Sequence, residues 1–170
     1  MNTTLVSLQE YLDTAYSPDR EYVDGHLIER NVGELNHGFL QLILGMALKA
    51  QGLRCYVEAR FQVCENRFRI PDVMALAPGQ KRKDRYQVET PYIVIEILSP
   101  DDRVVQMNEK LRDYFDKGVP NVWVLDPLAR ALTVHEPGKS RTVADRVETI
   151  DGTVLIDVAE LFRRLDEDEA

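Results

Sequence analysis

The sequence predicts an α/β domain in which helices flank a mixed central β-sheet. Two long stretches, 34–51 and 99–117, have the three- and four-residue apolar spacing of amphipathic helices. Short runs rich in valine, isoleucine and aromatic residues indicate strands. The most apolar run, 91–100, has proline at both ends, which is typical of a strand buried on both faces. The order helix, strand, strand, strand, helix, strand predicts a parallel, right-handed crossover between that strand and 121–125.

The N-terminal third predicts a short helix, a hairpin and a long helix. Ser7 and Glu10 form a capping box that opens a helix reaching about Thr14. Residues 20–30 predict an N-terminal hairpin with Asp-Gly as its turn, and 31–33 a loop. The long helix is predicted at 34–51 because apolar residues recur there at three- and four-residue steps: Leu35, Phe39, Leu42, Ile43, Met46 and Ala50.

The middle of the chain predicts two strands and a polar loop. Residues 54–63 alternate apolar and polar side chains, so we expect one strand with a wetter face. Residues 68–76 predict the next strand, and Pro71 within it predicts a bend or a sheet edge because proline cannot donate to a ladder. Residues 77–90 form a loop with a basic centre, Lys81-Arg-Lys83 with Arg85.

The C-terminal part predicts the second long helix and three further strands. Ser99, Pro100 and the acids Asp101 and Asp102 are typical of a helix start. The apolar positions of this helix predict its buried face. Strands are expected at 121–125 and at two outer positions, 131–136 and 141–147, before a last helix at 158–165. For the second long helix, the predicted buried face consists of Val104, Met107, Leu111, Tyr114 and Phe115.

Composition limits the classes of function. We find no internal repeat and no linker, so we expect one domain spanning 1–170, with a frayed acidic tail at 166–170. No apolar run approaches the roughly 20 residues of a membrane span, and the start lacks a signal-peptide pattern, so a cytoplasmic protein without a membrane partner is expected. Cys55 and Cys64 are expected to be reduced, and the histidines lack zinc-ligand spacing. The net charge of −8 argues against a broad nucleic-acid surface without excluding one.

Three residues could carry chemistry together. Glu96 stands in the middle of the buried strand, where an ionised side chain costs several kcal/mol unless a cation or donors meet it. Asp72 follows Pro71 in a neighbouring strand, and two such carboxylates repel unless a divalent cation lies between them. Oxygen ligands of this kind suit Mg²⁺ or Mn²⁺. Lys110 borders the buried helix face and can reach the sheet end, or it extends to water.

The chain resembles the Uma2 family, which is grouped with the PD-(D/E)xK restriction-endonuclease-like nucleases. The resemblance spans roughly residues 5–160 and is carried by 69–73, 91–100, Lys110 with Tyr114, and 118–127, with 21–29 and His37 also similar. It implies a restriction-endonuclease-like core. Asp72 and Glu96 would be its acidic metal ligands and the backbone carbonyl of Ile97 a further ligand. The superfamily lysine would fall at Leu98, so Lys110 resembles a migrated lysine.

Five further residues have two interpretations each. Glu34 is either an additional metal ligand from the first helix or an acid placed favourably at a helix N-terminus. His37 either lines the cleft or, as we favour, hydrogen-bonds within it. Glu58 is a cleft acid or an exposed strand residue, and Arg69 holds a phosphate or pairs with an acid. Tyr114 is cleft wall or, as we favour, core.

Two functions therefore compete. The first is a Mg²⁺-dependent endonuclease that hydrolyses phosphodiester bonds of DNA, with Asp72, Glu96 and Lys110 as its catalytic residues. The second is a catalytically inactive, homo-oligomeric interaction module with a nuclease fold. The acidic charge and the displaced lysine support the second. In either case we expect a homodimer, and the outer strands 131–136 and 141–147 could serve association.

Overall fold

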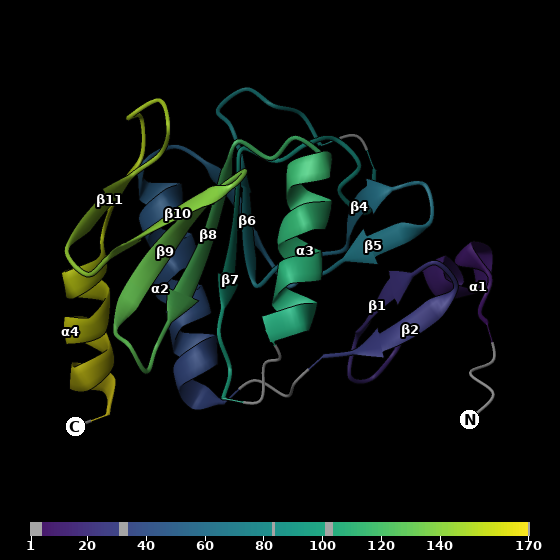
Figure 1. The fold of residues 1–170 in the computed structure, drawn as a ribbon, viewed down its shortest axis with the longest axis horizontal. Coiled ribbons are helices and arrows are strands. Elements are labelled where there is room, and N and C mark those ends of the chain that lie inside the picture. Colours follow the sequence, from purple (N-terminus) through teal and green to yellow (C-terminus); the bar gives the residue numbers. More distant parts are fainter. Residues whose placement is uncertain (1–4, 31–33, 83, 101–103, 170) are drawn as a thin grey trace.

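The computed structural model describes residues 5–30, 34–82, 84–100 and 104–169. Its centre is the predicted mixed sheet, six strands in the order β10-β9-β8-β7-β6-β3 (Figure 1). β7 and β8 are parallel, as the predicted crossover requires, and the other neighbours are antiparallel. The strands are β3 (Arg54–Val57), β6 (Val73–Leu76), β7 (Ile93–Ile97), β8 (Asn121–Asp126), β9 (Ala131–Glu136) and β10 (Lys139–Val143).

Each face of the central sheet is covered. On one face lie α2 (Leu35–Ala50), α4 (Val158–Asp168) and the hairpin of β11 (Arg146–Glu148) and β12 (Leu155–Asp157). The other face carries α3 (Val104–Asp116), which stands in front of the sheet in Figure 1, and part of a smaller sheet. That sheet has the order β2-β1-β5-β4, and α1 (Leu8–Asp13) packs on it through Tyr11. Its strands are β1 (Arg20–Val23), β2 (His26–Glu29), β4 (Phe61–Cys64) and β5 (Arg67–Arg69).

The alternation of β7 decides where Glu96 points. Ile93, Ile95 and Ile97 pack into the core on the α2 side, whereas Val94 packs into the core beneath α3. Because side chains alternate along a strand, Glu96 faces the α3 side together with Val94. All five residues of β7 are buried, as the sequence predicted.

The buried face of α2 includes only part of the apolar residues whose spacing predicted the helix. Leu40, Leu44 and Leu48 are buried, together with Gln41 and Ile43. Leu35, by contrast, is 91% exposed, and Leu42 and Met46 are also exposed. The helix carries apolar residues on two sides, so their spacing predicts a helix without deciding which side is buried.

Two predicted strands are split where the chain passes between the two sheets. The expected strand 54–63 breaks at Glu58, which has a φ of +48°, into β3 and β4. The expected strand 68–76 breaks at Pro71 into β5 and β6, so the bend predicted from that proline is present. The two breaks meet, because the Glu58 amide donates to the Asp72 carbonyl at 3.3 Å. They place both acids at the junction of the sheets.

Several other boundaries agree or shift. The Ser7 cap of α1 and the Asp24-Gly25 hairpin turn are as predicted. The expected outer strand 141–147 is divided between β10 and β11, β12 was not predicted, and α4 continues to Asp168. The loop 31–33 and the helix-start acids Asp101 and Asp102 lie outside the described residues.

Both cysteines are free. Within the described ranges, no helix combines the length and apolar character that crossing a membrane requires.

Candidate active site

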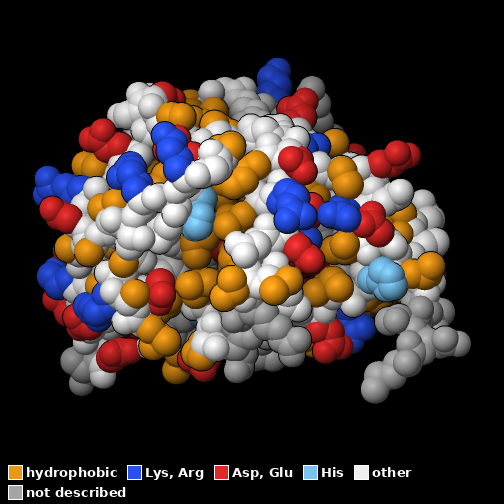
Figure 2. Space-filling view, viewed as in Figure 1, with side chains coloured by type: hydrophobic (Ala, Val, Ile, Leu, Met, Phe, Trp, Pro, Cys, Tyr) orange, Lys and Arg blue, Asp and Glu red, His pale blue; other side chains and the backbone are white. Residues whose placement is uncertain are grey.

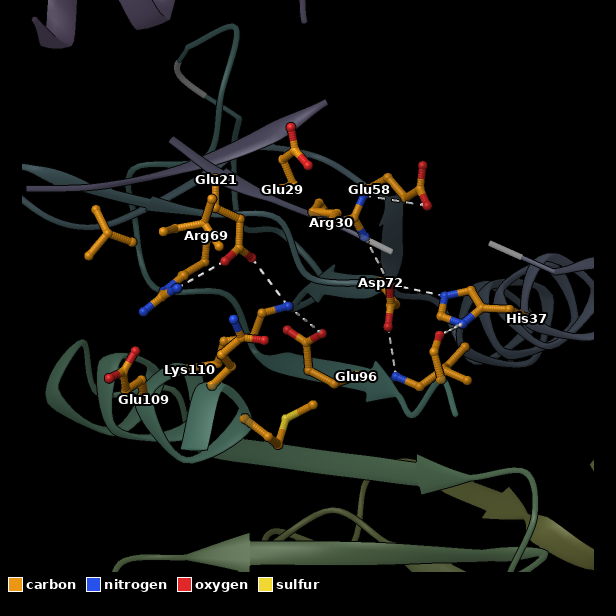
Figure 3. A pocket seen from close by; sticks show the side chains of 16 residues that line it. Glu21, Glu29, Arg30, His37, Glu58, Arg69, Asp72, Glu96, Glu109 and Lys110 are labelled. Atoms are coloured by element: carbon orange, nitrogen blue, oxygen red, sulfur yellow. Dashed lines mark hydrogen bonds and ion pairs between the residues drawn. The ribbon is translucent and has the colours of Figure 1, made fainter. Parts of the chain in front are cut away.

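A charged cavity of about 130 Å³ opens beside the C-terminal end of β7, on the α3 side of the central sheet. Figure 3 shows its charged side chains converging from both sheets and from α2 and α3. Among the described residues, six carboxylates line it against three lysine or arginine side chains and one histidine. These residues are Glu21, Glu29, Glu58, Asp72, Glu96 and Glu109, with Arg30, Arg69, Lys110 and His37.

Glu96 is met by side chains of α3. It is 1% exposed. The Lys110 ammonium Nζ donates to its Oε2 at 3.1 Å, and the Tyr114 hydroxyl donates to its Oε1. Burial raises the pKa of Glu96 to about 7, although the Lys110 charge opposes that rise. The buried carboxylate of the apolar strand therefore has a cation, and Lys110 reaches the site.

Asp72 has a larger set of donors. Its Oδ2 accepts from the Ile97 backbone N–H at 2.7 Å, which ties it to the end of β7. Its Oδ1 lies 3.0 Å from Arg30 Nη2 and 3.2 Å from His37 Nε2, and Gln41 donates to it at 3.4 Å. Burial alone would raise the pKa of Asp72, but the His37 hydrogen bond and the surrounding cations outweigh it, so the pKa lies below its ordinary value.

Lys110 lies between two carboxylates. Its Nζ is 3.1 Å from Glu96 Oε2 and 3.2 Å from Glu21 Oε1, and its side chain is 18% exposed. Burial favours the neutral amine, but the charges of Glu96 and Glu21 prevail and hold the pKa of Lys110 above its ordinary value. The lysine is therefore a cation at neutral pH.

Glu21 belongs to a buried ion-pair network that the sequence analysis missed. It accepts from Arg69 Nη1 at 2.9 Å and from the Ile70 backbone N–H at 3.0 Å. Arg69 Nε donates to Asp113 Oδ2 at 2.7 Å, and Arg67 Nη1 donates to Asp113 Oδ1 at 3.0 Å. Arg69 therefore pairs with two acids, and a role in holding a phosphate stays a prediction.

The remaining predicted site residues divide into three groups. His37 and Glu58 line the cavity: His37 pairs with Asp72, and Glu58 accepts from Gln41 at 3.2 Å and lies 3.5 Å from Arg30. Tyr114 is fully buried in the core, where its hydroxyl still reaches Glu96. Glu34 is the exposed N-cap of α2 and does not line the cavity.

Arg30 and Gln41 were also missed. Arg30 sits just past β2, and Gln41 is a buried polar residue on the sheet side of α2. Both hydrogen-bond to Asp72, which is far from them in the sequence, so no local spacing predicts these contacts. Only the buried polar position of Gln41 among apolar residues could have signalled it.

The donor set fits a magnesium-type ion better than zinc. Asp72, Glu96 and Ile97 all line the cavity, which has room for several water molecules. Among the residues that the structure describes, no three His, Cys, Asp or Glu side chains form a metal-binding cluster. Two carboxylates with retained waters match Mg²⁺ or Mn²⁺, whereas structural zinc needs four protein ligands.

The described residues of the basic loop, 77–82 and 84–90, lie away from this cavity. Ala75 pairs with Ile93 across β6 and β7, so the loop joins these strands at the end of the sheet opposite Asp72 and Glu96 (Figure 1). Figure 2 shows acidic and basic side chains intermixed over the α3 face rather than gathered into a broad basic surface. Arg67 and Arg69, two further basic side chains on β5, form ion pairs with Asp24, Glu21 and Asp113.

Comparison with known proteins supports a nuclease fold. Residues 8–163 match the Uma2 family, described as "Putative restriction endonuclease". The crystal structure of a putative nuclease belonging to DUF820 from Anabaena variabilis superposes with a TM-score of 0.80 at 19% identity, over 94% of this chain and 99% of that one. A DrdV–DNA complex solved by cryo-electron microscopy gives a TM-score of 0.42 at 17% identity, over 75% of this chain and 11% of that one. No protein with a curated description matches the chain.

Proposed function

Because the chain belongs to the Uma2 family, we propose that it is a divalent-metal-dependent endonuclease that hydrolyses phosphodiester bonds of DNA. One observation carries the proposal: Lys110, from a helix distant in sequence, pairs with Glu96 at 3.1 Å on the wall of the cavity that Asp72 also lines. Clustered acids and a lysine at one cavity are the parts that metal-assisted phosphoryl chemistry requires.

Asp72 and Glu96 would hold Mg²⁺ or Mn²⁺, with the backbone carbonyl of Ile97 as a further ligand. Such an ion, when bound, supplies a Lewis acid and lowers the pKa of its water. Restriction-endonuclease-like nucleases generally use divalent metals. The Ile97 amide orients Asp72 through the 2.7 Å hydrogen bond, so the strand end that offers the carbonyl also fixes the aspartate.

Lys110 would act as a cation rather than as a base. Its pKa is above the ordinary value because Glu96 and Glu21 flank it, so it has no free electron pair at neutral pH. A fixed ammonium can orient the attacking water and can stabilise negative charge that develops on the phosphate oxygens. Those are the roles that we assign to it.

The charge of the cavity explains why a metal would be needed for DNA to bind. Among its described lining residues, six carboxylates face three lysine or arginine side chains, and a phosphodiester brings a further negative charge. Like charges at this range repel, and the penalty grows as water is displaced. We therefore expect DNA binding at the cavity to depend on the divalent ion.

The test is nicking of supercoiled plasmid in Mg²⁺, Mn²⁺ or EDTA. Asp72→Asn, Glu96→Gln and Lys110→Met should each lower the rate at least roughly 100-fold, the scale of losing one group that stabilises transition-state charge. Lys139→Met, which removes an exposed lysine of β10, is the matched control. All variants are assayed where circular dichroism shows them folded. Wild-type nicking by the Asp72→Asn variant, or absence of nicking by the wild type with either metal, would overturn the proposal.

The alternative is a homo-oligomeric interaction module without catalytic activity. Its support is the apolar outer side of α2, where Leu35, Leu42 and Met46 are exposed. The outer strands are less suitable than expected, because β9 is internal to the sheet and β10 is exposed and carries Lys139 and Arg141. The homodimer remains a prediction. Sedimentation equilibrium of the wild type and of Leu42→Glu tests it, since a dimer through α2 should dissociate in the variant.

A further inference from the structure

We infer that Glu21 is the positioning residue for Lys110, which it holds in the cavity independently of Glu96. This inference rests on the proposed function. The Lys110 ammonium lies between two carboxylates, 3.1 Å from Glu96 and 3.2 Å from Glu21. In the proposed site Glu96 has a second task, because it binds the metal ion. Glu21 has no such task and stays available to the lysine.

Contacts other than the one with Lys110 hold Glu21 in place. It is buried on β1, where its Oε2 accepts from Arg69 and its Oε1 accepts from the Ile70 backbone N–H. A carboxylate with a guanidinium and a backbone donor has little freedom to rotate. The side chain therefore presents Oε1 to the cavity in one orientation.

The network closes on the helix that carries Lys110. Arg69, which holds Glu21, donates on its other side to Asp113, and Asp113 lies on α3 three residues after Lys110. Residues three apart on a helix share a face. Lys110, Glu21, Arg69 and Asp113 thus form a chain of three ion pairs that begins and ends on α3 and links this helix to β1 and β5.

The two carboxylates around Lys110 consequently differ in role. When Glu96 is committed to a metal ion, its hold on the ammonium weakens, because the carboxylate charge is shared. Glu21 then supplies the counter-charge that keeps Lys110 charged and directed into the cavity. Loss of Glu21 should matter most in the metal-loaded protein and least in the metal-free one.

The test measures the accessibility of Lys110 as well as activity. Glu21→Gln removes the charge with little change of shape, and Glu136→Gln is the charge-matched control, since Glu136 lies on β9, outside the cavity, and pairs with Lys139 rather than with Lys110. Acetylation of Lys110 by an amine reagent is followed by peptide mass spectrometry, with EDTA and with Mn²⁺. In Mn²⁺ the Glu21→Gln variant should be labelled about tenfold faster than the wild type, the scale of one charge-assisted hydrogen bond. In EDTA the difference should shrink, because Glu96 still holds the lysine.

Plasmid nicking gives the second measurement. Glu21→Gln should lower kcat roughly 10- to 100-fold while the KM for DNA and the calorimetric Mn²⁺ affinity stay within about twofold of wild type, because the variant displaces a group that acts in the transition state. Glu136→Gln should change neither kcat nor Lys110 labelling. Equal Lys110 labelling in Glu21→Gln and Glu136→Gln in Mn²⁺ would overturn the inference.

The two proposals fail separately. If the wild type does not nick DNA with any metal, the proposed function fails, and Lys110 labelling still decides the role of Glu21. If Glu21→Gln does not fold, because Arg69 loses its buried partner, Glu21→Asp replaces it: the charge and a partner for Arg69 remain, but the carboxylate is one methylene shorter. Faster Lys110 labelling in folded Glu21→Asp than in Glu136→Gln supports the inference, and equal labelling overturns it.

Discussion

Asp72 and Glu96 are two buried acids of one cavity that are held in different ways. They are 4% and 1% exposed; Asp72 directly precedes β6, and Glu96 lies in β7, the neighbouring strand of the same sheet. Asp72 accepts from Arg30, His37, Gln41 and the Ile97 amide, and its pKa is lowered. Glu96 accepts from Lys110 and Tyr114, and burial raises its pKa to about 7.

The difference shows that the hydrogen-bond donors around a buried carboxylate, rather than how deeply it is buried, decide here whether it is ionised. Both acids lose the same kind of solvation, so both would tend toward the neutral form. Asp72 accepts from Arg30, His37, Gln41 and the Ile97 amide and stays ionised, whereas Glu96 has, among the described residues, only the Tyr114 hydroxyl and the Lys110 cation, which it shares with Glu21. The ionised form of Glu96 is therefore the less stable of the two until a further cation arrives.

The largest expected effect is a difference in the free energy of unfolding between two neutral variants of similar shape, Asp72→Asn and Glu96→Gln, measured in EDTA. Asp72→Asn should lower the free energy of unfolding by about 3 kcal/mol, since it leaves Arg30 and His37 beside a neutral group, the usual cost of breaking a buried ion pair. Glu96→Gln should change it by less than about 1 kcal/mol at pH 7, because the wild-type carboxyl is already near its midpoint. Urea unfolding at pH 7 measures both. Equal losses in the two variants would contradict the comparison.

A second effect is the pH dependence of stability that Glu96 contributes. Its folded pKa of about 7 exceeds the unfolded value of 4.5, so the folded state binds more protons between these values. The stabilisation is complete below pH 4.5 and is lost as the pH rises through 7. Glu96→Gln lacks this loss, so its stability relative to wild type should increase by about 2 kcal/mol between pH 5 and pH 8.5, measured by urea unfolding in EDTA. A constant difference across this range would show that Glu96 is ionised throughout.

The smallest effect concerns His37, a donor to Asp72. Burial lowers the pKa of His37, but the hydrogen bond and charge of Asp72 raise it further, so the net shift is upward. The protonated ring stabilises the fold fully below pH 6.5, and this contribution disappears as the pH rises through the folded pKa. His37→Gln should cost about 1 kcal/mol at pH 5.5 and less at pH 8.5, by thermal or urea unfolding.

His135 provides a control of opposite sign for that prediction. Burial lowers its pKa, so its folded state releases a proton that the unfolded chain keeps. Wild-type stability therefore falls as the pH drops below 6.5 on account of this residue. His135→Gln should remove that loss and so gain relative to wild type at low pH. The same direction of change in both histidine variants would contradict the assignment of Asp72 as the partner of His37.

The sequence predicted features with local causes and missed those set by distant contacts. The strand at 93–97 was predictable because prolines bound an apolar run, and the hairpin because Asp24-Gly25 favours positive φ. The break at Glu58 was not, because a glutamate at φ +48° carries no glycine or proline signal. The buried face of α2 was not predictable, because apolar residues occupy two sides of the helix.

The candidate site divides in the same way. Glu96 was identifiable because a charge inside an apolar strand demands a partner, and Lys110 because it borders a buried helix face. Glu21 and Arg30 were missed because, in a hairpin with ordinary alternation, nothing local distinguishes a charge that turns inward. Their partners Lys110 and Asp72 come from other parts of the chain.

The hairpin of β1 and β2 has a consequence for how small a working fragment of this protein can be. A shortened chain that starts at residue 34 would keep Asp72, Glu96, Lys110 and all six strands of the central sheet. It would lose Glu21, and with it a counter-ion of Lys110, and Arg30, which neutralises Asp72. The N-terminal hairpin is thus part of the electrostatic balance of the cavity, and trimming it would spare both acids proposed to bind metal while removing charges that make their burial tolerable.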